Sequence, residues 1–221
     1  GELVQGAGVR VKVLDPADNS VIEELDTASE EQCLAALEAA QGAFKDWAAT
    51  PIGERAQWLD KFINAIMAEK ETIAELLAAE TGKPYKTAME DLYGFEDYAR
   101  YFVHEGARME GTTVYTPSKA YGELYHAVER RPLGVVVAHI AWNYPIAMAA
   151  LKIGPAMVAG DPIVLKPASD TPLATLYLGE IAAKIGMPKG VLNLVSGPSN
   201  VVAKTLNTSK IPSMITLIGS S

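Results

Sequence analysis

The second half of the chain alternates short apolar segments with longer helical stretches, and this alternation limits the folds open to it. The apolar segments, each a candidate strand, are residues 135–140, 162–165, 191–195 and 213–218. Helical stretches at residues 144–159 and 172–185 separate the first three. Strands that are apolar throughout are buried on both faces, and strand–helix–strand units of this spacing close as right-handed crossovers. The sequence therefore predicts an α/β fold around a parallel sheet.

The polar residues that follow these strands mark the expected ligand site. In open parallel sheets, ligands bind beyond the carboxyl ends of the strands. Those ends carry Trp142 and Asn143 after the first strand, Lys166 to Ser169 after the second, and Gly197 after the third. We expect the side-chain amide of Asn143 and the ammonium of Lys166 to open onto one crevice.

The first part of the chain is expected to begin with a small hairpin and a capped helix. Residues 9–14 alternate apolar with charged side chains, and turn-forming residues 15–19 precede a second apolar pair at 21–22. Ser29 with Gln32 resembles a capping box at the start of a helix. The apolar residues of that helix fall on one side, at steps of four and three: Cys33, Leu37, Ala40, Phe44 and Trp47.

Two further helices and a second hairpin are expected before the sheet. One helix should run over residues 53–80 and the next over residues 86–109, and glycine and proline separate them. Residues 112–115 and 121–131 then alternate apolar with polar side chains, which predicts a β-hairpin. Such an arm needs another surface to lie against.

Charge, cysteine content and hydropathy narrow the possible function classes. A net charge of -8 and a pI near 5.0 oppose a nucleic-acid partner, because that partner requires clustered Lys and Arg. The single cysteine, Cys33, excludes an intrachain disulfide and fits a reducing compartment, so a cytoplasmic location is expected. No histidine has a partner at metal-ligand spacing, so no metal site is expected. The longest apolar stretch, residues 146–160, is interrupted by Lys152 and Pro155 and is too short to span a membrane.

Several separated motifs, in order along the chain, resemble the aldehyde dehydrogenase superfamily. They are Glu80-Thr81-Gly82-Lys83-Pro84, Arg130 to Val135, Trp142-Asn143-Tyr144-Pro145, Lys166-Pro167, Thr171-Pro172, Gly190 to Asn193, and Gly219-Ser220. The resemblance covers the family's N-terminal portion only and implies a truncated aldehyde dehydrogenase fold. In that fold, residues 1–111 and 135–221 form a variant Rossmann nucleotide-binding domain that is incomplete at its C-terminus. Residues 112–134 form a protruding oligomerisation hairpin, and the catalytic domain is absent.

The resemblance also implies a reaction. It is the NAD(P)-dependent oxidation of an aldehyde to a carboxylic acid through a cysteine thiohemiacetal and a thioester. This chain would supply the cofactor site and the oxyanion asparagine but not the nucleophile, so alone it is expected to be inactive. Cys33 is no substitute, because its helical stripe points it into the core. The expected partners are a small aldehyde and, at full length, further copies in a homo-oligomer, a dimer or a tetramer.

One catalytic residue is implied by the resemblance. Asn143 matches the family's asparagine whose side-chain amide stabilises the oxyanion formed by thiolate attack, and such a donor is worth about 3 kcal/mol in the transition state. The local alternative is that Asn143 caps the helix beginning near Tyr144, and one amide can serve both purposes. Lys152 matches a lysine sometimes assigned to a proton relay, and a surface lysine is the alternative.

The implied cofactor site centres on Lys166, which matches a lysine that contacts the adenosine ribose. The alternative is a solvated lysine at a strand end. The other cofactor-binding residues that the resemblance implies are Ile140, Ala141, Trp142, Ala168, Ser169, Gly197, Gly219 and Ser220. At the glycines the backbone can approach the cofactor closely.

Two departures from the family pattern bear on the cofactor and on the loop. Ser169 stands where many NAD-using members have a glutamate that would repel a 2′-phosphate, so the resemblance favours NADP over NAD. The adjacent Asp170 could restore that repulsion. Ala141 replaces the family's usual proline, which removes a fixed φ from the loop that carries Asn143.

A different class of function is also compatible with this sequence. The chain could be a non-catalytic nucleotide-binding or assembly module derived from the same fold. Such a module would dimerise through the hairpin and hold adenosine at residues 166–169, and its sheet edge would need to be covered.

Overall fold

A four-stranded parallel sheet lies at the centre of the computed structural model, which describes residues 1–219. Its strands are β5 (Val136–His139), β6 (Ile163–Lys166), β7 (Leu192–Leu194) and β8 (Met214–Leu217), in the order β7-β6-β5-β8. Each neighbouring pair of strands is parallel. The predicted parallel sheet is confirmed.

The strand order produces a switch point between β5 and β8. The sheet grows from β5 to β6 to β7 in one direction, and β8 then adds on the other side of β5. In doubly wound sheets, the crevice that binds ligands lies outside the carboxyl ends of the strands where this order reverses. His139 at the end of β5 pairs with Leu217 of β8 and Lys166 of β6, so the segments that follow all three strands start at the same edge.

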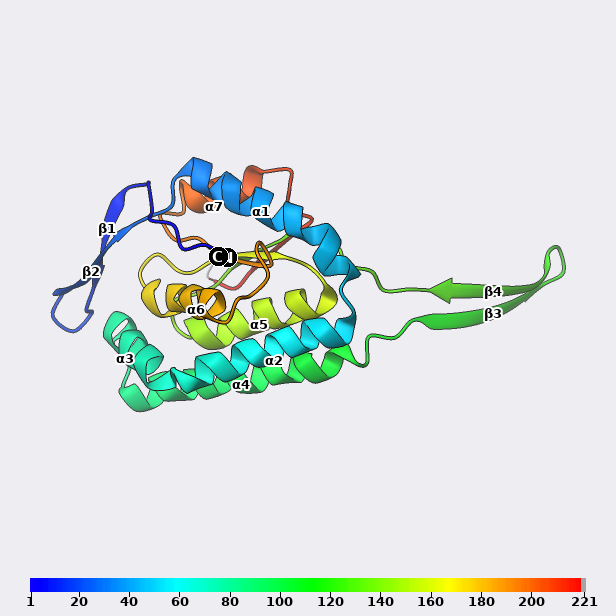
Figure 1. Cartoon of the computed structure of the whole chain (residues 1–221), viewed down its shortest axis with the longest axis horizontal. Coiled ribbons are helices and arrows are strands. Elements are labelled where there is room, and N and C mark those ends of the chain that lie inside the picture. The colour runs from blue at the N-terminus through cyan, green and yellow to red at the C-terminus, as the bar shows by residue number, and fades with distance from the viewer. Residues whose placement is uncertain (220–221) are drawn as a thin grey trace.

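Helices cover both faces of the sheet (Figure 1). They are α1 (Glu30–Ala49), α2 (Ile52–Ala68), α3 (Lys70–Thr81), α4 (Tyr85–Gly106), α5 (Pro145–Ala159), α6 (Leu173–Lys184) and α7 (Val202–Thr208). In Figure 1, α1 and α7 lie on one side, and α2, α4, α5 and α6 lie on the other. Successive side chains of β5 point to opposite faces of the sheet. Val137 packs in the smaller core beneath α1 and α7, whereas Val136 and Ala138 pack in the larger core on the other face.

The helix predicted over residues 53–80 is wrong in one respect, because the chain forms two helices there. The break lies at Glu69, whose φ of -111° and ψ of 18° leave the helical region. Its carboxylate accepts hydrogen bonds from Tyr177 and Lys184 of α6 instead. The apolar pattern continues across the break because α2 and α3 pack on the same core, so periodicity alone could not locate it. The short helix α7 was not predicted.

Two hairpins extend from the helical layers, as predicted. The first pairs β1 (Arg10–Leu14) with β2 (Val21–Asp26), and the second pairs β3 (Thr112–Ser118) with β4 (Gly122–Val128). The second hairpin projects far from the rest of the molecule (Figure 1), and no residue of its two strands is buried. An assembly role for it remains a prediction.

The α1 stripe is largely confirmed. Cys33, Leu37, Ala40 and Trp47 are buried, whereas Phe44 is half-buried. None of the helices in residues 1–219 combines the length and apolar character needed to cross a bilayer.

Candidate active site

The structure places the loops after β5 and β6 side by side at the carboxyl edge of the sheet. The backbone N–H of Ile140 donates to the carbonyl of Lys166 at 3.2 Å, and the backbone N–H of Ile218 donates to the carbonyl of His139 at 3.0 Å. Further out, the hydroxyl of Thr171 donates to the carbonyl of Trp142 at 3.4 Å. The backbones that carry the predicted site residues therefore meet at the switch point.

Lys166 is a buried cation with neutral partners. Its side chain sits at the end of β6 with the residue only 4% exposed, and its ammonium donates to the carbonyl of Pro167 at 3.0 Å and lies 3.5 Å from the hydroxyl of Ser169. Within residues 1–219 no carboxylate lies within ion-pair distance of it. Burial lowers its pKa, although nearby Asp170 acts in the opposite direction. A solvated strand-end lysine, the alternative weighed from sequence, is therefore wrong.

Ser169 links the ends of β6 and β7. Its hydroxyl donates to the carbonyl of Gly197 at 3.2 Å. Gly197 has a φ of 152°, and a Cβ there would lie 2.8 Å from a methyl group of Val202 and 2.9 Å from the Cβ of Thr27. Packing of this turn against the N-terminal segment is thus sufficient to require glycine at this position.

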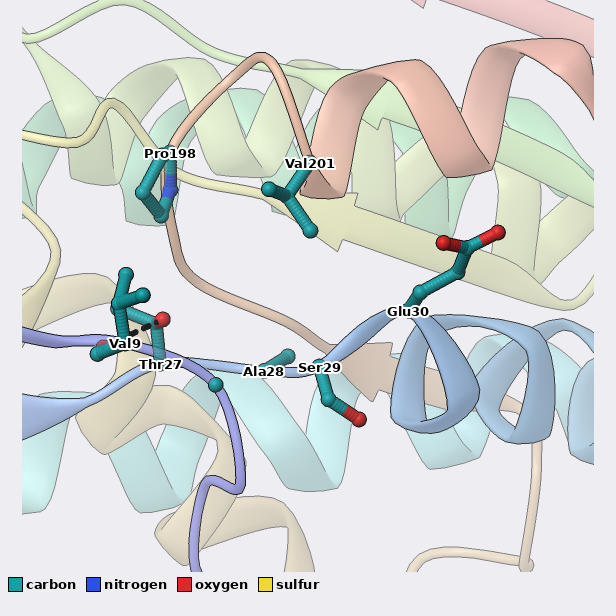
Figure 2. A pocket seen from close by; sticks show the side chains of 8 residues that line it. Val9, Thr27, Ala28, Ser29, Glu30, Pro198 and Val201 are labelled. Atoms are coloured by element: carbon teal, nitrogen blue, oxygen red, sulfur yellow. Dashed lines mark hydrogen bonds between the residues drawn. The ribbon is translucent and has the colours of Figure 1, made fainter.

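A hollow of about 180 Å³ lies beside that turn (Figure 2). Its wall comes from the segments that precede β1, α1 and α7, and includes Val9, Thr27, Ser29, Pro198 and Val201. The hydroxyl of Thr27 is turned to the carbonyl of Val9 at 2.7 Å, so most of the lining is apolar. Of the described residues predicted for the site, none lines this hollow, although Gly197 adjoins it.

Asn143 does not cap α5. That helix starts at Pro145, its N-cap residue is Tyr144, and no side chain caps it locally. Asn143 is exposed, and within residues 1–219 its side-chain amide makes no hydrogen bond. The capping alternative is therefore wrong, and the amide is available to a ligand.

Two residues that sequence reasoning missed hold the Asn143 loop. The ammonium of Lys83, from the connection between α3 and α4, donates to the backbone carbonyl of Asn143 at 2.7 Å and lies 4.4 Å from the centre of the Tyr144 ring. It also forms an ion pair with Asp91 at 3.2 Å. The other carboxylate oxygen of Asp91 accepts the N–H of Ala147 in the first turn of α5 at 2.7 Å. Burial raises the pKa of Asp91, and its bonds to Ala147 and Lys83 oppose that rise.

Glu80 holds the next helix in the same way. Its two carboxylate oxygens accept the N–H groups of Leu173 and Ala174 at 2.7 and 3.0 Å, at the start of α6, which has no local side-chain cap. The residue is 3% exposed, and burial raises its pKa to about 7. Both Glu80 and Lys83 belong to the segment 80–84, for which the sequence suggested a family match but no role.

The remaining predicted site residues occupy diverse environments. Ile140 is 4% exposed and packs in the larger core, whereas Trp142 is 58% exposed. Ala141 and Ala168 are half-buried, and Gly219 is exposed. Ser220 lies outside the described residues.

Three further residues named from sequence have structural explanations. Lys152 is half-buried and donates to the hydroxyl of Thr216 at 2.6 Å, so the surface-lysine alternative is wrong. The His139 ring pairs with the amide oxygen of Asn207 at 2.8 Å, and burial lowers its pKa. Burial raises the pKa of Cys33 to about 11, which disfavours the thiolate. In residues 1–219 no three His, Cys, Asp or Glu side chains are grouped as a metal site.

Comparison with known proteins identifies a family whose model matches nearly the whole chain. The model of the "Aldehyde dehydrogenase family" matches residues 3–221. The chain is 38% identical over 210 residues to a 3,6-anhydro-alpha-L-galactose dehydrogenase from Vibrio sp. strain EJY3, covering 95% of this chain and 43% of that protein. It is 32% identical over 215 residues to a D-glyceraldehyde dehydrogenase (NADP(+)) from Picrophilus torridus, covering 97% and 43%.

Solved structures match equally well. A 3,6-anhydro-L-galactose dehydrogenase in complex with NADP aligns with a TM-score of 0.91 and 36% identity, covering 99% of this chain and 46% of that one. PnpE in complex with nicotinamide adenine dinucleotide aligns with a TM-score of 0.92 and 32% identity, covering 100% and 45%. The chain therefore spans less than half the length of the proteins it matches.

Proposed function

Because the chain belongs to the aldehyde dehydrogenase family, we propose that it supplies the cofactor-binding and oxyanion-stabilising part of an enzyme that oxidises an aldehyde to a carboxylic acid with NAD(P). The observation that carries this proposal is the buried ammonium of Lys166, whose partners are neutral, beside the loop of Asn143. A buried cation with neutral partners is expensive unless a ligand compensates it. Its environment therefore suits the hydroxyl and phosphate oxygens of a dinucleotide.

The dinucleotide would lie along the carboxyl edge of the sheet. Lys166 and Ser169 would contact the adenosine ribose, and the backbone near Ile140, Ala141 and Ala168 would border it. Trp142 would line the tunnel that holds the cofactor or the substrate. Gly197 and Gly219 would let the backbone approach the cofactor, and Ser220 would contact a phosphate oxygen. When bound, this cofactor accepts the hydride that the aldehyde loses.

Asn143 would act on the substrate. When a thiolate attacks the aldehyde carbon, the C=O π electrons move to the oxygen, and a fixed N–H donor stabilises the resulting charge. The exposed amide of Asn143 has no competing partner in residues 1–219, and its backbone is anchored. Both conditions favour a preorganised donor.

The nucleophile would come from elsewhere in the protein. Cys33 is buried and its raised pKa keeps it as a thiol, so it is a poor nucleophile. We propose that a cysteine and an activating glutamate lie beyond residue 221 and form the thiohemiacetal, then the thioester that water hydrolyses. On this proposal, residues 1–221 alone lack oxidation activity.

NADP is the favoured cofactor. The hydroxyl of Ser169 lies 3.5 Å from the ammonium of Lys166. If this hydroxyl turned away from the carbonyl of Gly197, both groups could donate to a 2′-phosphate. Introducing a carboxylate with Ser169→Glu in the full-length enzyme should weaken NADP binding relative to NAD, whereas Asp170→Asn should strengthen it. Unchanged NADP dissociation constants for both variants would remove residues 169 and 170 from cofactor selection.

The domain assignment and assembly follow from the same family membership. Residues 1–111 and 135–221 would form the nucleotide-binding domain, and residues 112–134 an arm that joins copies into a homo-oligomer. A cytoplasmic location is proposed on separate grounds, because a single cysteine fits a reducing compartment. The exposed rings of Tyr115 and Tyr125 on that arm, 5.1 Å apart, support a contact role.

The central test is Asn143→Ala in the full-length enzyme. Turnover should fall by about 100-fold or more, because one oxyanion donor is lost, while the cofactor dissociation constant stays within about threefold. Asn64→Ala, at an exposed position on α2, is the control. Equal loss of turnover and cofactor affinity would contradict the oxyanion role.

A second function is favoured by the exposed apolar side chains of Met214, Ile215 and Leu217 on the edge strand β8. They suit a non-catalytic nucleotide-binding or assembly module that another surface covers. The intact mass of the natural protein separates the two proposals. A mass near 23.6 kDa supports the module, and a much greater mass with a later cysteine and glutamate supports the enzyme.

A further inference from the structure

We propose that Lys83 and Asp91 are positioning residues that fix the backbone of Asn143 and thereby aim its side-chain amide. The inference rests on the proposed function of Asn143. It assigns a role to a buried ion pair that touches neither the expected cofactor contacts nor the reacting atoms.

The first contact is direct. The Lys83 ammonium donates to the carbonyl oxygen of Asn143 at 2.7 Å and covers the ring of Tyr144 at 4.4 Å from its centre. Lys83 reaches this place because Gly82, with a φ of 69°, ends α3 in the left-handed conformation and Pro84 is the N-cap residue of α4. A connection of three residues thus delivers one cation to the loop.

The ion pair with Asp91 fixes the position of the Lys83 ammonium and therefore restrains its hydrogen bond to Asn143. The side chain of Asp91 is fully buried, and that of Lys83 is only 11% exposed. One carboxylate oxygen of Asp91 holds the ammonium of Lys83 at 3.2 Å, and the other accepts the N–H of Ala147 at 2.7 Å. The ion pair of Lys83 with Asp91 therefore holds both the loop at Asn143 and the first turn of α5 at Ala147.

Other restraints on the loop are weak. Apart from Lys83, the side-chain hydrogen bond to residues 141–144 within residues 1–219 comes from Thr171, at 3.4 Å. Trp142 and Asn143 are exposed, so packing does not hold their side chains. Ala141 leaves φ free where proline would fix it. The orientation of the Asn143 amide therefore depends mainly on the ion pair.

The test uses Lys83→Met, which removes the donor but keeps the aliphatic stem, in the full-length enzyme. A double variant, Lys83→Met with Asp91→Asn, removes both charges and keeps an acceptor for Ala147, so it remains informative if the single variant fails to fold. Lys86→Met, an exposed lysine on α4, is the matched control. We expect turnover to fall by about tenfold to 100-fold, since a displacement near 1 Å has effects of that size. The cofactor dissociation constant should stay within twofold.

A second measurement reports on the loop without activity. Amide hydrogen exchange of peptides that span residues 141–148 should become at least tenfold faster in the Lys83→Met and double variants and stay unchanged in Lys86→Met. Exchange at β5 should stay unchanged in all variants. Unchanged exchange at residues 141–148 together with turnover within twofold of the wild type would overturn the inference.

A combination with Asn143→Ala separates this inference from the proposed function. If Lys83 acts through Asn143, adding Lys83→Met to Asn143→Ala should lower turnover by less than threefold further. A full additional loss would show that Lys83 acts independently and would overturn the positioning role. If Asn143→Ala alone leaves turnover intact, the oxyanion function fails, and exchange at residues 141–148 still decides whether the ion pair holds the loop.

Discussion

Helix α1 and the two helices that follow the loops of the candidate site, α5 and α6, begin in different ways. At α1, the hydroxyl of Ser29 accepts the N–H of Gln32 at 3.2 Å, and the Gln32 side chain accepts the N–H of Ser29 at 3.1 Å. The helices α5 and α6 have no such local cap. Their first turns are capped by Asp91 and Glu80, from 56 and at least 93 residues away along the chain.

This difference separates a self-contained element from elements that depend on the assembled fold. The acceptors for α1 are fixed once its own first turn forms. The acceptors for α5 and α6 arrive only when α4 has packed against α5 and α3 against α6. The loops that precede α5 and α6 carry the predicted site residues, so the geometry of the site should respond to changes in the segment from Glu80 to Asp91.

The largest expected effect of breaking a distant cap is at Asp91. Asp91→Ala leaves the Lys83 ammonium without its carboxylate and the Ala147 N–H without its acceptor. Removing one partner of a buried ion pair should lower the free energy of unfolding by about 4 kcal/mol. Chemical denaturation measures this, with Asp60→Ala as the control, because the ion pair of Asp60 with Arg100 is partly exposed and should contribute at most about 1 kcal/mol. If Asp91→Ala and Asp60→Ala lost similar amounts of unfolding free energy, the buried ion pair would contribute no more than the partly exposed one, and the contrast between local and distant caps would be contradicted.

A pH dependence should distinguish the cap at Glu80 from the cap at α1. The pKa of Glu80 is about 7 in the folded protein against 4.5 as its usual value, so the folded state binds more protons between these pH values. Its contribution to stability is fully present below pH 4.5 and is lost as pH rises through 7. The difference in unfolding free energy between the wild type and Glu80→Gln should therefore fall by about 3 kcal/mol from pH 4.5 to above pH 7. A flat difference would show that its two backbone hydrogen bonds fully offset burial, and a difference that rose with pH would show that they outweigh it.

Much of the fold was predictable because its signals are local. The parallel strands lie within mainly apolar segments, the α1 cap lies within four residues, and the hairpins contain turn-forming residues. The break at Glu69 could not be predicted, because its contacts with Tyr177 and Lys184 are tertiary and the apolar period continues past it. Short α7 follows a turn that contains Gly197 and Pro198, and it has no long apolar pattern.

The placement of the loops that carry the candidate site residues was predictable, but the contacts that hold these loops were not. A parallel sheet places the residues after its strands at one edge, and the structure brings the Asn143 and Lys166 loops together there. A weaker signal for Asp91 was present in the sequence, because this acidic residue shares the buried face of its helix with Ala88, Leu92 and Phe95. A charged residue on an apolar stripe needs a buried partner, but the sequence does not reveal which one.

The smallest expected effect is at the local cap of α1. Ser29→Ala removes one acceptor from an otherwise solvated first turn, so the free energy of unfolding should fall by about 1 kcal/mol. The effect should be independent of pH between 5 and 8, because serine does not titrate there, and exchange at residues 141–148 should not change. Denaturation of Ser29→Ala beside Asp91→Ala measures the contrast. If Ser29→Ala destabilised the protein as much as Asp91→Ala, or loosened the Asn143 loop, α1 would be coupled to the site and the distinction between local and distant caps would fail.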